Sequence, residues 1–442
     1  MRMKAVLITV VILAWTPMAL GETGSCKIQE ELLTFGSNDS YDGVTNGSDV
    51  IYTSVTLGSK NLYRIDSHYV EHGVAVHYGD QHHADVDGNK VVYVDDELGY
   101  NNLWVHEIDT GASYPVTFES SDNYSPAISG DYVAYVEEVN SAYEIRYTDL
   151  VTFMPYYVTR NNYDELNFSL DGGLVAWSIY EGGTANLYAT EIGGGTFTIA
   201  ADSAAHETGP SIDGDRVAYL CNTAIDIYDR ATGLTTRVLE EDTHMKRNLH
   251  LEGNVVYWSD KRNGNQNTDV FMLDLETGRV HQLTSDSHHQ GLTDAFQNQI
   301  IYTDSRLGNK NVWRTTWEFN TLPAADAGLD QLVDLGQIVE LAGGATDDDD
   351  DEITSWLWAI ESAPDGSIAT LLDPTTAGAS FTPDLPGEYV FSLLAGDDWD
   401  NSLPDFVTVT VTPEPATLSM LALGGLAMLR RRRRIPHSQI RS

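Results

Sequence analysis

Short apolar runs that end in an aromatic residue recur along the first two thirds of the chain. The seven copies are Val50-Ile51-Tyr52, Val91-Val92-Tyr93, Val133-Ala134-Tyr135, Val175-Ala176-Trp177, Val217-Ala218-Tyr219, Val255-Val256-Tyr257 and Ile300-Ile301-Tyr302. Consecutive aromatic residues are 41, 42, 42, 42, 38 and 45 positions apart. β-Branched and aromatic residues favour strands, and a strand that returns at such a period indicates a radial repeat.

The residues around each run predict four short strands per copy. Four copies share a glycine six positions after the aromatic residue, as the turn of a β-hairpin requires: Gly58, Gly99, Gly183 and Gly308. A four-stranded unit cannot bury both of its faces alone, whereas seven units around an axis can. The last copy lacks its fourth strand, and residues 28–34 offer the missing one. We therefore expect an all-β, seven-bladed β-propeller over residues 28–319, in which the N-terminal strand closes the last blade.

Two of the copies carry a polar motif after the aromatic residue. It runs from Asp260 to Asn265 in one copy and from Asp304 to Asn309 in the next. On these residues the repeat resembles that of TolB-type propellers, and the resemblance covers roughly residues 28–319. It implies the fold and no particular activity, because propellers support binding, scaffolding and catalysis alike.

A second series of short strands follows Pro323. The apolar alternation over residues 323–412 is typical of an immunoglobulin-like β-sandwich. The acidic run 347–351, Trp356-Leu357-Trp358 and Gly387-Glu388-Tyr389-Val390 together resemble a PKD-type domain. Neighbouring carboxylates repel one another, and Ca²⁺ binds about six to eight oxygens. We therefore predict a calcium site at Asp347, Asp349 and Asp351, with a solvated turn as the alternative.

The two ends of the chain carry transport signals. A charged start, an apolar core and small residues near position 21 predict a signal peptide over residues 1–21. At the other end, Pro413, Glu414 and Pro415 precede an apolar stretch and the basic run that begins with Arg430 and Arg431. Residues 413–434 thus resemble a PEP-CTERM sorting signal. The resemblance implies an exosortase-type transpeptidase as a partner, transient membrane contact, and a destination at the cell surface or in the extracellular matrix. A plain tail anchor is the alternative.

The charge of the chain limits its partners. The 66 acidic and 25 basic residues give a formal net charge of −41. Such a charge repels nucleic acid and anionic membrane surfaces, so we exclude both as partners. It suits divalent cations or a salty exterior, although solubility alone also accounts for it.

Histidines stand in the connections that lead into blades two, five, six and seven. The candidates for a ligand or transition-metal site are His82, His83, His206, Glu207, His244, His288 and His289. In a propeller these connections fall on one face, where imidazole and carboxylate groups can bind Zn²⁺ or Mn²⁺, or an acidic sugar. Exposed polar loop residues are the alternative. Oligogalacturonate lyases are similar seven-bladed propellers with a His-rich metal site, but no contiguous motif supports that match, so no catalytic residue follows from it.

These features favour an exported binding or scaffold protein without catalytic activity, whose ligand is an extracellular polysaccharide or a matrix protein. The alternative is a metal-dependent polysaccharide lyase or hydrolase that uses the His-bearing face. A purely structural matrix protein is a third possibility. A convergent histidine cluster with a bound metal favours the enzyme, and histidines on separate loops favour the binding protein.

Overall fold

The computed structural model describes residues 10–11 and 25–413, except residues 119, 140, 141, 162, 166, 203, 265 and 266. The predicted signal peptide, apart from the two-residue strand β1 (Val10–Val11), lies outside the described residues, as does the predicted sorting signal from Glu414 onward. The described chain divides into two compact units, residues 28–318 and residues 319–413 with residues 25–27. Within these described ranges there is no helix long and apolar enough to cross a membrane.

Residues 26–319 form seven sheets, which we call blades 1 to 7 in chain order. Blades 1 and 2 comprise β3 (Ser40–Thr45), β4 (Val50–Thr56), β5 (Ser59–Ile65) and β6 (Glu71–Ala75), then β7 (Gln81–Asp87), β8 (Lys90–Asp95), β9 (Asn102–Glu107) and β10 (Ser113–Pro115). Blades 3 and 4 comprise β11 (Asn123–Ser129), β12 (Tyr132–Val139), β13 (Ala142–Asp149) and β14 (Met154–Tyr157), then β15 (Phe168–Asp171), β16 (Leu174–Glu181), β17 (Thr184–Glu191) and β18 (Thr196–Ala200). Blades 5 and 6 comprise β19 (Glu207–Asp213), β20 (Arg216–Cys221), β21 (Ala224–Asp229) and β22 (Leu234–Leu239), then β23 (Lys246–Glu252), β24 (Val255–Asp260), β25 (Asp269–Asp274) and β26 (Val280–Gln282). Blade 7 comprises β27 (Gln290–Phe296), β28 (Gln299–Asp304), β29 (Asn311–Phe319) and β2 (Cys26–Leu32), with β1 beside β2.

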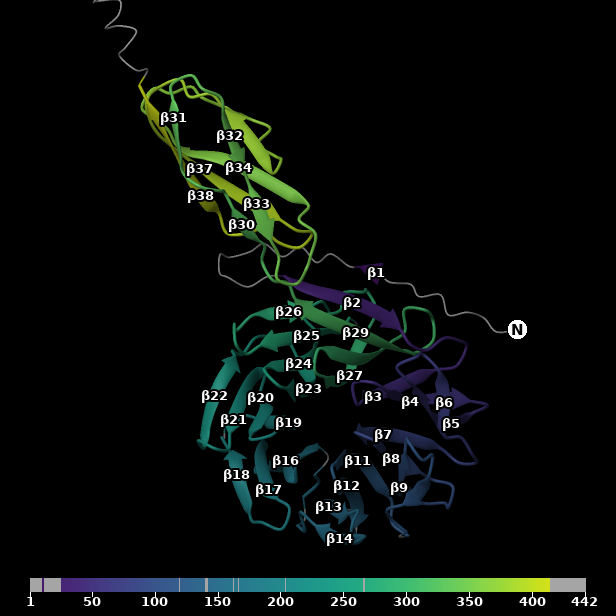
Figure 1. Cartoon of the computed structure of the whole chain (residues 1–442). Helices are drawn as coiled ribbons and strands as arrows, with labels where there is room; N and C mark the ends of the chain where they lie inside the picture. The colour runs from purple at the N-terminus through teal and green to yellow at the C-terminus, as the bar shows by residue number, and fades with distance from the viewer. Residues whose placement is uncertain are drawn as a thin grey trace, which may run out of the picture. The chain divides into compact units, whose positions relative to one another are not determined.

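The blades surround a common centre (Figure 1). The first strand of each blade contacts the first strand of the next, from β3 through β7, β11, β15, β19 and β23 to β27. β27 in turn contacts β3, so the series of contacts closes into a ring. β2 lies beside β29, which is the position predicted for the closing strand. The architecture is therefore the predicted all-β propeller.

The recurring aromatic residues explain why the repeat packs this way. Each of them lies in the second strand of its blade and is at most 3% exposed. Tyr135 of blade 3 packs with Val92 and Leu103 of blade 2, and Tyr52 of blade 1 packs with Ile301 of blade 7. Each aromatic side chain in these clusters thus fills the space between its own blade and the preceding one. Burial of such a side chain contributes about 1.5–3 kcal/mol.

Carboxylates of the innermost strands join neighbouring blades. Asp85 Oδ2 accepts a hydrogen bond from the backbone N–H of Ile128 at 2.8 Å, and Asp294 Oδ2 accepts one from Thr45 N–H at 2.7 Å. Burial raises the pKa of each carboxyl to about 7, and for Asp85 the charge of Asp294 adds to the effect. Asp294 belongs to blade 7 and Thr45 to blade 1, so this bond spans the point where the ring closes.

A buried ion-pair network also holds the closing strand. Glu30 of β2 is 4% exposed, and its Oε1 accepts a hydrogen bond from the Tyr302 hydroxyl at 2.9 Å. Arg306 Nη1 lies 3.1 Å from Glu30 Oε2, and Arg306 Nε lies 2.5 Å from Asp304 Oδ2. The guanidinium group also lies over the Trp313 ring, 4.3 Å from its centre. One arginine therefore neutralises a carboxylate on the closing strand and another within blade 7.

The second unit contains the strands predicted for a sandwich. Its strands are β30 (Ala324–Asp326), β31 (Gln331–Asp334), β32 (Val339–Ala342), β33 (Gly344–Thr346), β34 (Ser355–Ser362), β35 (Leu371–Leu372), β36 (Gly378–Phe381), β37 (Gly387–Gly396) and β38 (Asp405–Thr412). One sheet has the order β31-β38-β37-β34, a second has the order β32-β36-β35, and β30 pairs with β33. Trp358, Phe381 and Phe391 are buried in the hydrophobic core of this unit. The fold class predicted for this part of the chain is correct.

Candidate functional site

His82 and His83 are the predicted site residues that contact each other. Both lie in β7, and their Nδ1 atoms are 2.6 Å apart. Burial, and to a lesser extent the charge of the neighbouring His83, lower the pKa of His82 to about 4. The His82 ring is therefore neutral at pH 7. The pair marks the beginning of the first strand of blade 2.

The predicted site residues of blade 5 contact blade 4 and their own connection. The ring of His206 stacks on Tyr180, with 5.6 Å between ring centres, and its Nδ1 lies 3.2 Å from the backbone nitrogen of Ala185. Glu207 is 2% exposed, and its Oε1 accepts a hydrogen bond from Asp202 N–H at 3.2 Å. Burial raises the pKa of this carboxyl.

The predicted histidines of blades 6 and 7 also lie near residues of their own connections. His244 Nδ1 is 3.6 Å from Asp242 Oδ2, and His288 Nδ1 is 2.6 Å from Asp286 Oδ1. His289 is exposed, and partial burial lowers its pKa. Among the residues that the structure describes, two groups of three side chains converge as potential metal ligands, and none of the predicted histidines belongs to either.

One of these groups consists of the predicted calcium ligands. Single oxygen atoms of Asp347, Asp349 and Asp351 lie within 4.8 Å of one another. The Lys27 ammonium group contacts Asp349 at 2.9 Å and also contacts Asp351. Burial lowers the pKa of Lys27, but its hydrogen bonds to the two carboxylates outweigh this and raise the pKa above its ordinary value. The structure thus brings the three carboxylates together, and Lys27 forms ion pairs with two of them.

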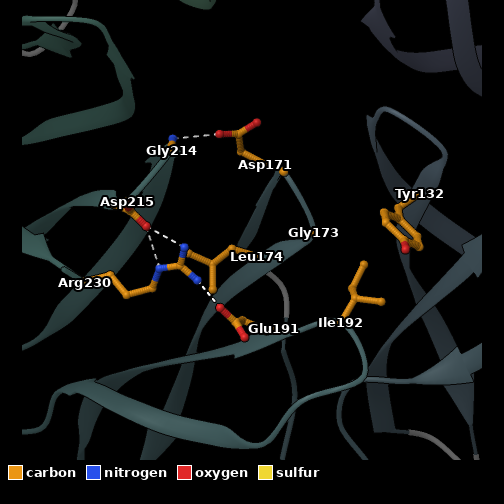
Figure 2. Close-up of a pocket in the computed structure, with 10 residues that line it drawn as sticks. Tyr132, Asp171, Gly173, Leu174, Glu191, Ile192, Gly214, Asp215 and Arg230 are labelled. Carbon is orange, nitrogen blue, oxygen red and sulfur yellow. Dashed lines mark hydrogen bonds and ion pairs between the residues drawn. The ribbon is translucent and has the colours of Figure 1, made fainter.

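A pocket lies at the other end of the strands, away from the predicted histidines. It has a volume of about 480 Å³ and is formed mainly by turns of blades 4 and 5 (Figure 2). Arg230 donates hydrogen bonds to Asp215 Oδ1 from Nε at 2.8 Å and from Nη2 at 2.5 Å, and it also contacts Glu191. Asp171 Oδ2 accepts a hydrogen bond from Gly214 N–H at 2.8 Å. Charged groups held in fixed orientations by these hydrogen bonds therefore line one side of the pocket.

Tyr132 of blade 3 lies across the pocket from Arg230 and Asp215 in Figure 2. The Tyr132 ring makes an edge contact with Tyr147 at 6.0 Å between centres, and Tyr147 stacks on Tyr156 at 5.1 Å. Tyr147 and Tyr156 are directly opposite each other in β13 and β14. We call Tyr132, Tyr147 and Tyr156 the tyrosine ladder. It leads from the pocket to β14, an edge strand whose four residues are all exposed.

The tyrosine ladder is not evident from the sequence. Its tyrosines come from three strands, and their strand pattern resembles that of the buried aromatics. The available signal is Met154-Pro155-Tyr156-Tyr157, an outer-strand segment that combines a proline, which cannot donate a ladder hydrogen bond, with large side chains. Such a segment at a sheet edge has no neighbouring strand to cover it.

Two family models match the C-terminal part of the chain. A model described as a PKD domain matches residues 327–411, and the PEP-CTERM protein-sorting motif matches residues 411–434. The chain therefore carries a PKD domain. The sorting motif indicates an exported protein that exosortase-type machinery processes and sorts to the cell surface. The comparison with curated proteins found no match.

The fold is similar to that of several solved structures. An oligogalacturonate lyase in complex with manganese is 14% identical with a TM-score of 0.54, over 71% of this chain and 96% of that chain. The β-propeller domain of the Trilobed protease from Pyrococcus furiosus is 12% identical with a TM-score of 0.51, over 65% and 96%. TolB from Acinetobacter baumannii is 16% identical with a TM-score of 0.41, over 55% and 65%. At these identities the first two similarities, with TM-scores above 0.5, show the β-propeller fold alone.

Proposed function

We propose that this exported protein binds an extracellular polysaccharide without cleaving it, and that the tyrosine ladder and the adjoining pocket form the binding site. The observation that carries the proposal is the continuity of three contacting tyrosines with a pocket lined by oriented polar groups. A sugar ring has apolar C–H faces and a rim of hydroxyl groups. Aromatic faces beside hydrogen-bonding side chains match that chemistry.

The charges in the pocket favour a neutral polysaccharide. Asp171, Glu191 and Asp215 face a single cation, Arg230, among the described lining residues. The chain as a whole is also strongly acidic, with a formal net charge of −41. An acidic polysaccharide would be repelled on approach, whereas a neutral one would not. Hydroxyl groups can both donate to the carboxylates and accept from the guanidinium group.

A metal-dependent lyase or hydrolase is the alternative. The fold similarity to an oligogalacturonate lyase in complex with manganese supports it at the level of architecture. The predicted histidines do not support it as strongly, because His206 stacks on Tyr180 of blade 4 and His288 pairs with Asp286 of its own connection. We therefore favour binding over cleavage. We also propose the extracellular matrix as the final location, since a polysaccharide-binding propeller on a surface-sorted chain can hold matrix material.

The test is retention of the mature protein on a panel of immobilised neutral and acidic polysaccharides, with release of new chain ends measured in parallel. We expect retention on a neutral polysaccharide, and an affinity about 5- to 150-fold weaker when Tyr156 or Tyr147 is replaced by alanine, since stacking on an aromatic ring contributes about 1–3 kcal/mol. Tyr100→Ala is the matched control, because Tyr100 is 46% exposed and Tyr156 is 47% exposed.

Two results would overturn the proposal. One is retention that Tyr147→Ala and Tyr156→Ala leave unchanged, which would locate binding elsewhere. The other is release of unsaturated or reducing ends that stops when His83, His206 and His289 are replaced, which would favour the enzyme.

A further inference from the structure

Blades 6 and 7 place a cation next to a buried aspartate. Asp260 and Asp304 are the last residues of β24 and β28, and they are 0% and 1% exposed. In each blade an arginine two residues later pairs with the carboxylate. The distances are 2.6 Å from Arg262 Nη2 to Asp260 and 2.5 Å from Arg306 Nε to Asp304. A buried carboxylate needs such a partner, because burial without one is strongly unfavourable.

Blade 2 has the aspartate but not the arginine. Asp95 ends β8 and is 3% exposed, and the residue two positions later is Glu97. A second carboxylate therefore stands where blades 6 and 7 have a guanidinium group. His77 approaches both acids, with Nε2 at 3.2 Å from Asp95 Oδ2 and Nδ1 at 3.4 Å from Glu97 Oε2. These are the three residues of the second converging group.

More oxygen atoms surround His77 Nδ1 than one proton can satisfy. The carbonyl oxygen of Tyr78 lies 3.1 Å from it, in addition to Glu97 Oε2. A ring nitrogen carries at most one hydrogen, so it can donate to one of these two acceptors. A metal ion at this position would interact favourably with both oxygens and with the nitrogen.

Gln81 adds an independent observation. Its side chain is 0% exposed, and Oε1 has no hydrogen-bond partner among the described residues. Nε2 of the same amide lies 3.4 Å from both His77 Nδ1 and the Tyr78 carbonyl oxygen. A half-turn of the amide would exchange the two atoms and place Oε1 beside His77 Nδ1 and the Tyr78 carbonyl oxygen. The turn gives up the hydrogen bond between the Gln81 amide and Asp95, and a metal ion would compensate by giving Oε1 the partner that it now lacks.

We infer that blade 2 binds a divalent first-row transition metal through His77 Nδ1, Glu97, the Tyr78 carbonyl oxygen and the Gln81 amide oxygen. The separations of 3.1–3.4 Å from Nδ1 to its neighbours match ligands about 2.0–2.2 Å from a shared ion. Asp95 then receives the Nε2–H of His77, which is the usual partner of a metal-bound imidazole. One nitrogen and three oxygens suit Mn²⁺ or Zn²⁺.

The ion would replace the arginine of the other blades. It would link the connection between β6 and β7 to the end of β8, as Arg306 links β2 to the end of β28. His77 and Glu97 are partly exposed, with side chains 39% and 47% accessible, so the ion can enter from solvent. The site requires no conformational change other than the turn of the Gln81 amide.

The experiment measures Mn²⁺ binding to the chelator-treated mature protein by the electron paramagnetic resonance signal of free Mn²⁺. An Asp349→Asn background weakens the acidic cluster of the second unit. We expect one site in this background, with binding at least about 10-fold weaker in Glu97→Gln and His77→Ala and about 10–100-fold weaker in Asp95→Asn. His68→Ala is the matched control, since His68 is an exposed histidine that follows β5 and belongs to neither converging group.

The Glu97→Arg variant distinguishes a protein that has lost only the metal site from a protein that no longer folds. It restores the pairing seen in blades 6 and 7, so we expect no Mn²⁺ binding and a thermal midpoint at least equal to that of the metal-free parent. Zn²⁺ should displace Mn²⁺, because it binds such ligands more tightly. Mn²⁺ binding that survives in both Glu97→Gln and His77→Ala would overturn the inference. So would a parent protein that binds no more Mn²⁺ than Glu97→Arg does.

Discussion

Asp294→Asn tests whether buried carboxylates at the centre of the propeller make its stability depend on pH. Asp294 Oδ2 accepts the Thr45 N–H that links blade 7 to blade 1, and burial raises its pKa to about 7. Asparagine keeps an oxygen that can accept the same hydrogen bond, but it cannot ionise. The substitution therefore removes the charge and preserves the link between the blades.

The expected magnitude follows from the difference in pKa between the folded and the unfolded protein. An unfolded aspartate has a pKa of about 3.9, and each pKa unit of difference corresponds to about 1.4 kcal/mol. The folded protein holds the proton more tightly, so its stability is greatest below pH 4 and is lost as the pH rises from 4 to 7. His250 Nδ1 lies 3.6 Å away, but burial lowers its pKa below the ordinary value, so it carries no charge at pH 8. The wild type should therefore be less stable than Asp294→Asn by up to about 4 kcal/mol at pH 8.

The assay is urea unfolding of the mature protein at pH 4, 6 and 8, followed by tryptophan fluorescence. The free energy of unfolding of Asp294→Asn should equal that of the wild type at pH 4. It should exceed the wild-type value at pH 6, and by more at pH 8. Asp109→Asn, at an exposed turn position, is the control for removal of one negative charge from a highly acidic protein. Two results would refute the reasoning. One is an Asp294→Asn variant that is more stable than the wild type by the same amount at all three pH values, and the other is a variant that is no more stable than the wild type at pH 8.

Three further substitutions test the ring and the second unit. Arg306→Ala should lower the free energy of unfolding by about 3–5 kcal/mol in chemical denaturation, because Glu30 and Asp304 would remain buried without their cation; a loss below about 1 kcal/mol, typical of a surface pair, would contradict the network. Tyr135→Ala should destabilise by about 3–5 kcal/mol in the same assay, since it empties a contact between blades 2 and 3; an unchanged urea midpoint would show that neighbouring side chains refill the space. We also propose that Ca²⁺ binds the acidic cluster. Saturating Ca²⁺ should then stabilise the protein by about 1–3 kcal/mol in calorimetry, and Asp349→Asn should abolish the effect; a wild type without stabilisation would rule the site out.

The architecture could be predicted because its determinants repeat. A buried aromatic such as Tyr135 must fit between two blades in every copy, so the same residue type returns at a regular spacing. The polar sites have no such repetition. Asp95 and Glu97 differ from Asp304 and Arg306 at one position of a shared motif, and only the fold brings His77 to that position.

The predicted histidines illustrate a second limit. The repeat indicates that they lie close to the start of the first strands, although His82 and His83 are in β7 itself and not in the connection before it, and the repeat does not indicate their partners. His206, which precedes blade 5, stacks on Tyr180 in the second strand of blade 4, and the sequence does not indicate which of several nearby groups a loop side chain will contact. The tyrosine ladder cannot be predicted for a different reason. Its tyrosines lie in strands, as the buried aromatic residues do, and the sequence does not show that Tyr156 is exposed.

The pairing of β2 with β29 also determines when the propeller can be completed. The closing strand β2 precedes β3 and its partner β29 is the last strand of the propeller, so β2 is synthesised well before its partner is available. Until then Glu30 has neither Arg306 nor Tyr302 beside it, and blade 7 is incomplete. Contacts between residues so distant in sequence form slowly. We therefore expect the pairing of the two ends of the ring to be the last step of folding, and a substitution in β29 should slow refolding more than one in blade 3.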